Sequence, residues 1–316
     1  MRVALLYEHP QWSLELLERL QRRNVDVRPI DVGAASYTPH QMSEPCDLWL
    51  NRINAMPSSG RSSSVVAAAN HLLLALDLAN QRVVNGWRAH AIGASKAAQA
   101  ALFASVDLAT PTSLAISDPK ALFTTAGFPT LTFPVVTKPN VGGSGRGISR
   151  HETAAELGAA IDGGVVDLGL DGTGLVQSVI DSADGLIYRV EILGDELFYA
   201  TTQPIKAGAF NYCAVDGCHG DDGPGSTITL FSPTPDVVDE ARTVLRAAGA
   251  DLGSVEFLID DKTGGRVYYD FNPYSNFVTG QNDALGFDPI ERYLDYALDP
   301  SAELPTTYVP GVAIVD

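Results

Sequence analysis

The sequence predicts a mixed α/β protein of two or three packed units, and three observations support this prediction. The chain has 316 residues, which is more than one small hydrophobic core accommodates. Its first part alternates strand-like and helical segments, which is typical of a doubly wound unit. Its later part contains neighbouring strand-like segments joined by short turns, which are typical of antiparallel hairpins. We therefore expect a doubly wound N-terminal unit followed by hairpin-rich units.

The first segments of the chain predict the doubly wound unit. Residues 2–7 are apolar like a buried parallel strand, and we expect Ser13 to cap a helix with leucines at helical spacing. Strand-like residues 25–32 complete a β-α-β unit, and residues 47–53 predict a further strand. The polar loop after this strand lies where open α/β sheets bind ligands. It therefore either shapes a substrate pocket or is a solvated connection.

The remaining elements follow from periodicity and turn residues. The expected helices cover residues 65–78, 89–106, 152–161, 236–248 and 289–298. The expected strands cover residues 82–86, 133–137 and 175–180, together with a hairpin over 186–200 that turns at Gly194-Asp195. A boundary between two units is expected near residue 87.

Charge and apolar segments exclude some classes of partner. The net charge of −17 makes nucleic acid an unsuitable partner, because phosphate contacts need a clustered basic face. It also disfavours anionic membrane surfaces. No segment approaches the roughly 18 apolar residues of a membrane span, and the apolar run at the N-terminus is too short for a signal sequence. We therefore expect a cytoplasmic protein without nucleic-acid or membrane partners.

A glycine-rich loop follows a strand that carries a lysine. Four glycines fall within residues 142–147, just after Lys138, and Arg146 lies among them. Glycines let backbone N–H groups converge on phosphate oxygens, and the two cations add positive charge. The loop matches neither of the common phosphate-binding glycine motifs, since its lysine precedes the glycines. It is either a triphosphate-binding loop or a flexible hairpin tip.

A second polar pattern lies on a hairpin near the C-terminal end. Residues 255–259 and 267–272 read as two strands joined by a turn rich in Asp and Gly. Asp270 and Asn272 share one face of their strand, and Glu256 can oppose them on the partner strand. Two carboxylates and an amide oxygen suit a hard divalent cation such as Mg²⁺. The alternative is a solvated polar strand face.

The two patterns together resemble the ATP-grasp superfamily, and within it the RimK-like and glutathione synthetase-like carboxylate–amine ligases. The resemblance covers most of the chain in the expected order. It implies an ATP-grasp fold with a Rossmann-like pre-ATP-grasp domain at 1–87, a central lobe with the glycine-rich flap at 88–177, and a C-terminal lobe with the metal site at 178–316. The two α+β lobes would enclose the nucleotide.

The resemblance also assigns roles to particular residues. ATP would be held by two lysines, the flap and the strand between the lobes, namely Lys96, Lys138, Gly142, Gly143, Ser144, Gly145, Arg146, Gly147, Gln177, Ser178, Val179 and Ile180. Two Mg²⁺ ions, which Mn²⁺ can replace, would be held by Glu256, Asp270 and Asn272. Lys96 can equally be a surface lysine, and Ser178 stands where the family usually has a Glu.

Further residues would face the reacting groups. Arg189 and Lys206 would be catalytic, although Arg189 can instead form a cross-strand ion pair with Glu191 or Glu196. Three residues are expected to contact substrate: Arg52, Asn211 and Asn276. In RimK-like ligases the loop that corresponds to residues 206–213 leads to an Arg-Gly-Gly turn, whereas residues 214–220 stand at that place here and lack the arginine.

The activity implied by the resemblance is ATP-dependent amide or peptide bond formation through an acyl phosphate, with release of ADP and phosphate. The substrates would be small-molecule or peptide carboxylates and amines, and such ligases often form homo-oligomers. A small-molecule kinase and an inactive nucleotide-binding regulatory module are the alternatives. Of the three cysteines, Cys213 and Cys218 lie near His219 and either bind zinc or are plain reduced thiols.

Overall fold

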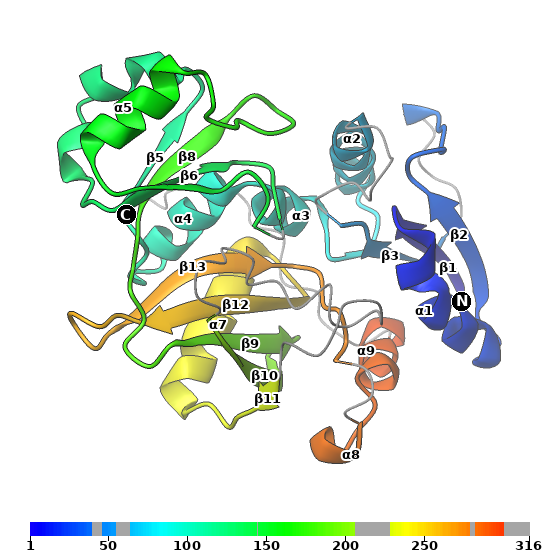
Figure 1. Cartoon of the computed structure of the whole chain (residues 1–316). Helices are drawn as coiled ribbons and strands as arrows, with labels where there is room; N and C mark the ends of the chain where they lie inside the picture. Colours follow the sequence, from blue (N-terminus) through cyan, green and yellow to red (C-terminus); the bar gives the residue numbers. More distant parts are fainter. Residues whose placement is uncertain (40–45, 55–63, 144, 206–227, 279–281, 300–316) are drawn as a thin grey trace, which may run out of the picture.

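The computed structural model describes residues 1–39, 46–54, 64–143, 145–205, 228–278 and 282–299. It contains three β-sheets with helices packed around them (Figure 1). In Figure 1 the sheet of the glycine-loop region lies above, a five-stranded sheet lies below, and the N-terminal sheet lies to the right. Among the described residues, no helix is both long enough and apolar enough to span a lipid bilayer.

The N-terminal sheet is parallel, with strand order β2-β1-β3-β4. Its elements are β1 (Arg2–Tyr7), α1 (Pro10–Arg22), β2 (Asp26–Asp31), β3 (Leu48–Arg52), α2 (Ser64–Leu78) and β4 (Val83–Val84). Val3 and Leu5 of β1 pack in the cluster that contains α1, while Ala4 and Leu6 pack in the cluster that contains α2. The expected doubly wound unit is therefore present, because both faces of β1 are covered.

Two details of this part differ from the sequence-based expectation. Ser13 lies inside α1 and is buried, because Pro10 already begins the helix and His9 occupies the N-cap position. The single helix expected over 89–106 is two helices, α3 (Trp87–Ala94) and α4 (Lys96–Ser105). The backbone of Ser95 between them is extended, and its hydroxyl caps α4 by accepting a hydrogen bond from Ala98 N.

The central sheet is antiparallel, with order β5-β8-β6-β7. Its elements are β5 (Ser113–Ile116), the short 3₁₀ helices Pro119–Thr124 and Phe128–Thr130, β6 (Val135–Pro139), β7 (Ser149–His151), α5 (Ala154–Asp162) and β8 (Gly174–Ser178). The glycine loop connects β6 to β7. A separate hydrophobic cluster, built from residues between 114 and 176, holds this sheet together with α5.

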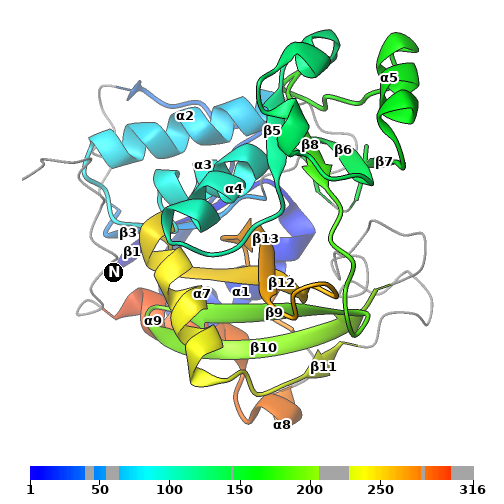
Figure 2. The ribbon, with the colours of Figure 1, turned by 90° about the vertical axis from the view of Figure 1, so that its left-hand side faces the viewer.

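The five-stranded sheet has order β11-β10-β9-β12-β13. Its elements are β9 (Leu186–Leu193), β10 (Glu196–Pro204), β11 (Thr229–Leu230), α7 (Pro235–Ala248), β12 (Leu252–Ile259) and β13 (Arg266–Asn272), followed by α8 (Asn282–Leu285) and α9 (Pro289–Leu298). Figure 2 shows α7 lying across one face of this sheet. One hydrophobic cluster contains residues of this sheet and of α7, and helices α3 and α4 contribute Ala89, Leu102 and Phe103 to it. Both helices therefore pack on this sheet.

The N-terminal unit is joined to the five-stranded sheet by a shared hydrophobic core. One cluster contains Leu5 and Leu50 of the N-terminal strands together with Leu252 of β12 and Tyr293 of α9. The buried side chain of Asn85 adds hydrogen bonds, because its Oδ1 accepts from Asp251 N (2.7 Å) and Leu252 N (3.0 Å). These contacts make the two units one packed body.

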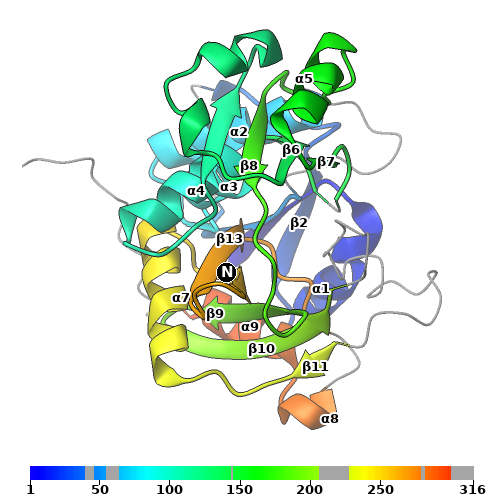
Figure 3. The same ribbon diagram turned by 60° about the vertical axis from the view of Figure 1, so that its left-hand side comes forward.

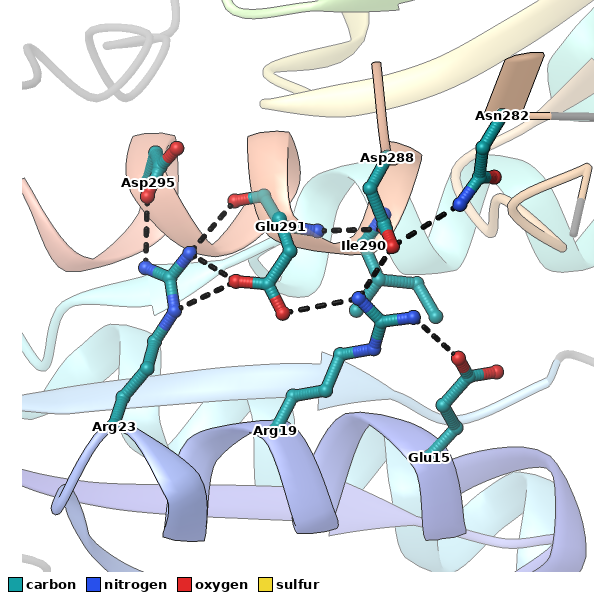
Figure 4. A network of polar contacts seen from close by, with 8 residues as sticks. All are labelled: Glu15, Arg19, Arg23, Asn282, Asp288, Ile290, Glu291 and Asp295. Carbon is teal, nitrogen blue, oxygen red and sulfur yellow. Dashed lines mark hydrogen bonds and ion pairs between the residues drawn. The ribbon is translucent and has the colours of Figure 1, made fainter.

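A network of ion pairs covers the outer side of this joint (Figure 4). Arg19 of α1 donates to Asp288 Oδ2 at 2.6 Å and to Glu291 Oε1 at 3.0 Å. Arg23 pairs with Glu291 and with Asp295, the latter at 2.8 Å. Asp288 also caps α9 by accepting from Ile290 N, so one carboxylate both begins this helix and binds α1.

Candidate active site

Lys138 lies near the end of β6 in the central sheet, and Figure 3 shows this sheet above the five-stranded sheet. Its Nζ donates to Gln177 Oε1 of β8 at 2.8 Å, and Gln177 Nε2 donates in turn to Ser113 Oγ at 2.8 Å. Burial, together with the nearby charge of Lys96, lowers the pKa of Lys138 to about 7, while Asp270 opposes the shift. The surroundings of Lys138 therefore favour its neutral form. A nearby anion would favour the charged form.

Lys96, the first residue of α4, forms a salt bridge with Asp270 of β13. Both side chains are mostly buried, with 20% and 23% of their surfaces exposed. Gln99 supports the pair from the next turn of α4, since its Oε1 accepts from Lys96 Nζ (3.3 Å) and Phe271 N (3.3 Å). A predicted nucleotide-binding residue and a predicted metal ligand thus contact each other directly.

Glu256 and Asp270 are directly opposite each other on β12 and β13, as the hairpin pattern predicted. Arg189 of β9 donates from Nη1 to Glu256 Oε1 at 3.0 Å and from Nε to Glu191 Oε1 at 3.0 Å. Tyr269 donates to Glu256 Oε2 at 2.9 Å. Burial raises the pKa of Glu256, the charge of Asp270 raises it further, and Arg189 opposes both.

Arg189 pairs with Glu191, one of the two partners offered as the alternative to a catalytic role, but both residues lie on β9, so this pair is within one strand. Its cross-strand partner is Glu256 of β12. The pair with Glu191 does not remove the guanidinium from the cluster, because the same side chain also reaches Glu256. Ion pairs link Arg189 to Glu191 and Glu256, and Lys96 to Asp270, which lies opposite Glu256. Lys138 is near enough for Lys96 and Asp270 to shift its pKa, and these six residues are called the charge cluster here.

The residues predicted to hold Mg²⁺ fit a hard cation by their chemistry. Glu256 is buried beside the like charge of Asp270, and such a pair is stabilised by an added positive charge. Asn272 Oδ1 accepts from Tyr274 N at 2.9 Å and keeps a second lone pair. Among the described residues, no group of three or more His, Cys, Asp or Glu side chains suits a metal ion, so the predicted set depends on the amide oxygen.

The glycine loop has a backbone that glycine favours at two positions. Gly145 and Gly147 have φ of +68° and +72°. A Cβ atom on Gly147 would lie 2.6 Å from Asp167 Oδ2 and 2.7 Å from Pro139 Cγ, so a side chain there would collide with the base of the loop. Gly142 and Gly143 are half-buried and Arg146 is exposed, while Ser144 lies outside the described residues.

The predicted hinge strand provides fewer backbone groups than expected. Ser178 N donates to Thr112 O and Val179 N donates to Pro134 O, both at 2.9 Å. The hydroxyl of Ser178 accepts from Thr132 N at 2.9 Å. Gln177 uses its side chain to position Lys138, and Ile180 is half-buried beyond the end of β8. The role of these residues in binding adenine stays a prediction.

Arg52 is held by packing against the C-terminal part of the chain. Its guanidinium carbon lies 3.9 Å from the ring centroid of Tyr274 and 4.5 Å from that of Phe277, and Nη2 donates to Ser275 O at 2.6 Å. Only 4% of Arg52 is exposed, whereas Asn276 is half-buried. Their contact with substrate stays a prediction. Five other candidates lie outside the described residues: Lys206, Asn211, Cys213, Cys218 and His219.

Three residues that contribute to the cluster were not identified from the sequence. Gln99 lies three residues after Lys96, and helical spacing was the available signal. Asn140 follows the strand that carries Lys138, and its contacts with Ser95 become visible only in the fold. Tyr269 adjoins Asp270 in sequence, yet its hydroxyl reaches Glu256 of the partner strand.

Comparison with known proteins places this arrangement in a known fold. No family model and no curated protein sequence matches the chain. Among solved structures, it is similar to a RimK-domain ATP-grasp protein from Sphaerobacter thermophilus (18% identity, TM-score 0.67, covering 95% of this chain and 100% of that one). It is also similar to the D-alanine–D-alanine ligase of Bacillus anthracis in complex with ATP (13% identity, TM-score 0.65, 94% and 97% covered). A third similar structure is the ATP-grasp ligase PsnB in complex with a minimal precursor (16% identity, TM-score 0.63, 94% and 98% covered). The chain has the ATP-grasp fold.

Proposed function

We propose that the chain is an ATP-dependent carboxylate–amine ligase. The observation that carries this proposal is the charge cluster, in which Lys96 pairs with Asp270 and Asp270 lies directly opposite the buried Glu256. The charges of Lys96 and Asp270 also shift the pKa of Lys138 on the central sheet. A triphosphate with its metal needs cations on one side and oxygen ligands on the other. The cluster offers both cations and carboxylate oxygens.

The structural neighbours support this choice of reaction and ligands. The Bacillus anthracis enzyme was solved with ATP, and PsnB was solved with Mg and ADP together with a precursor variant. MdnC from Microcystis aeruginosa, also similar in structure, is a macrocyclase bound to a precursor peptide. We extend ATP and magnesium to this chain, with a small-molecule or peptide acid and an amine as substrates. The division at residues 87 and 177 is part of the same proposal.

In the proposed reaction, a substrate carboxylate oxygen attacks the γ-phosphorus of ATP and ADP leaves. The amine nitrogen then attacks the acyl carbon, the carbon–oxygen bond to phosphate breaks, and the amine loses a proton. Mg²⁺ bound by Glu256, Asp270 and Asn272 would supply charge neutralisation at the phosphates. No nucleophilic side chain of the chain is needed, because positioning and charge neutralisation dominate phosphoryl transfer.

The chain's own residues would act on the phosphates and on water. Lys138 would bind a phosphate oxygen and take up a proton as it does so, because an added anion reverses the shift of its pKa. Lys96 would leave Asp270 for the nucleotide, which frees this carboxylate for the metal. Arg189 would face the transferred phosphoryl group from β9. The glycine loop would cover the phosphates and exclude water from the acyl phosphate.

The test is a screen of acid and amine pairs with ATP and magnesium, in which ADP, phosphate and the coupled product are all measured. We expect at least one pair of acid and amine for which amide, ADP and phosphate form in equal amounts. A phosphorylated acid that accumulates at an undiminished rate without amine would instead identify a kinase. Nucleotide binding without ADP formation for any pair would identify a regulatory module.

A further inference from the structure

Asn140 lies at the junction between β6 and the glycine loop, two residues after Lys138. Both its backbone and its side chain contact the beginning of α4. Its carbonyl oxygen accepts from Lys96 N at 3.0 Å. Its Oδ1 accepts from Ala97 N at 2.9 Å and from Ser95 Oγ at 3.0 Å. One residue of the loop base therefore binds three consecutive residues of another element.

These contacts complete the cap of α4. The first N–H groups of a helix have no partner within the helix and need one from elsewhere. Here Lys96 N and Ala97 N donate to Asn140, and Ala98 N donates to Ser95 Oγ at 3.2 Å. The cap is shared between a local serine and an asparagine more than forty residues away in the sequence.

Asn140 is itself held in the central sheet. Its backbone N donates to Thr173 O at 3.0 Å, and its Nδ2 donates to Asp171 Oδ2 at 3.3 Å. Lys96, in contrast, reaches toward the five-stranded sheet, where it pairs with Asp270. Asn140 thus connects the sheet that carries Lys138 to the helix whose first side chain touches the predicted metal ligand.

We propose that Asn140 is a positioning residue that holds Lys96 at Asp270 and near Lys138, and this inference rests on the nucleotide site of the proposed function. By fixing the first turn of α4 to the loop base, Asn140 makes the place of Lys96 depend on the place of the glycine loop. When nucleotide binds under the loop, the side chain of Lys96 is then already positioned to contact the phosphates. The side chain of Asn140 contacts α4 and Asp171, so Asn140 would act on the nucleotide through Lys96.

The experiment is a double-mutant cycle on Asn140 and Lys96, read out as the dissociation constant of ADP with saturating magnesium by isothermal titration calorimetry. Asn140→Ala is expected to weaken binding about tenfold in the wild-type background, which corresponds to about 1.4 kcal/mol. In the Lys96→Met background the same change is expected to weaken binding less than twofold. A purely structural effect would instead give the same loss in both backgrounds.

Controls separate folding damage from loss of positioning. Asn70→Ala on α2, which removes a comparable asparagine hydrogen bond far from the cluster, should leave the dissociation constant unchanged. Ser95→Ala, which removes the helix-side partner of Asn140, is the second variant if Asn140→Ala does not fold, and it should weaken binding about threefold. Equal losses in both Lys96 backgrounds, or no loss from Asn140→Ala and Ser95→Ala, would overturn the inference while leaving the proposed function intact. Absence of ADP binding by the wild-type chain would overturn both.

Discussion

The N-terminal unit and the central sheet are connected to the five-stranded sheet in different ways. The N-terminal unit shares a hydrophobic cluster with β12 and α9 and adds the ion pairs of Arg19 and Arg23. The central sheet has a cluster of its own, built from residues between 114 and 176. Its connections to α4 include the polar contacts of Asn140, and Lys138 adds a charge beside Lys96 and Asp270.

This difference indicates where a ligand can act on the molecule. Apolar burial is non-directional and joins two units firmly, whereas polar contacts exchange partners when a charged ligand arrives. The polar side is also where the candidate active site lies. A bound magnesium nucleotide would therefore strengthen the joint that depends on polar contacts and leave the apolar joint unchanged.

The largest expected effect comes from removing a charge at the polar joint. Asp270→Asn and Glu256→Gln should each lower the rate of ADP formation about 1,000-fold, because the lost charges serve the metal and not the core. The rate is measured with the acid and amine pair found in the screen. Asp239→Asn, on the exposed side of α7, is the matched control and should keep the wild-type rate. A variant of Asp270 or Glu256 with a near-wild-type rate at saturating magnesium would remove that residue from the set of ligands.

The second expected effect is a loss of stability when a leucine is removed from the central cluster or from the cluster shared by the N-terminal unit and the five-stranded sheet. Leu157→Ala and Leu294→Ala both remove a fully buried side chain from a helix and should each cost about 2–5 kcal/mol. Hydrogen exchange should distinguish them. Leu157→Ala should speed exchange in β5, β6 and β8 but not in β1 or β12, because Leu157 belongs to the central cluster. Leu294→Ala should speed exchange in β1 and β12 together. Identical exchange patterns for both variants would mean that the two joints do not differ.

A smaller effect is expected at Lys138, with opposite signs for stability and binding. The folded protein lowers the pKa of Lys138 from 10.5 to about 7, so the unfolded chain holds this proton more tightly between these values. Lys138→Met should therefore stabilise the free protein by about 1 kcal/mol, or roughly 1–2 °C for a chain of this length, at pH 7. This is less than the full shift implies, because the side chain is only half-buried and keeps its hydrogen bond to Gln177.

The pH dependence checks the sign of that prediction. The advantage of Lys138→Met should be largest below pH 7 and decline as the pH rises toward 10.5, where the lysine is neutral in both states. Thermal unfolding at several pH values measures it, and calorimetry with ADP and magnesium should show a large loss of affinity in the same variant. A lower melting temperature at pH 7 would contradict the burial of this charge.

The smallest effect is expected at the rim of the apolar joint. Asp295 pairs with Arg23 but is 71% exposed, so Asp295→Asn should change the free energy of unfolding by less than about 0.5 kcal/mol. Chemical denaturation measures the change. A loss above about 2 kcal/mol would show that the ion pairs, and not the shared core, hold the N-terminal unit in place.

Local patterns in the sequence predicted the parts of this fold that depend on neighbouring residues. The hairpin of β12 and β13 follows from alternation and turn residues, and it placed Glu256 opposite Asp270 correctly. The break at Ser95 was missed, because the residue that completes the cap is Asn140 in another unit. The aromatic environment of Arg52 could not be predicted from the sequence, because Tyr274 and Phe277 are more than 200 residues away and contact Arg52 only in the folded chain.

The most direct test of the central claim is a crystal structure with manganese and a non-hydrolysable ATP analogue. Manganese gives an anomalous signal, so its position can be found independently of the nucleotide. We expect an anomalous peak within coordination distance of the Glu256 and Asp270 carboxylates. We also expect the triphosphate to lie between β6 and β13, with Lys138 in contact with its phosphate oxygens. Nucleotide bound elsewhere, or a manganese peak away from both carboxylates, would contradict it.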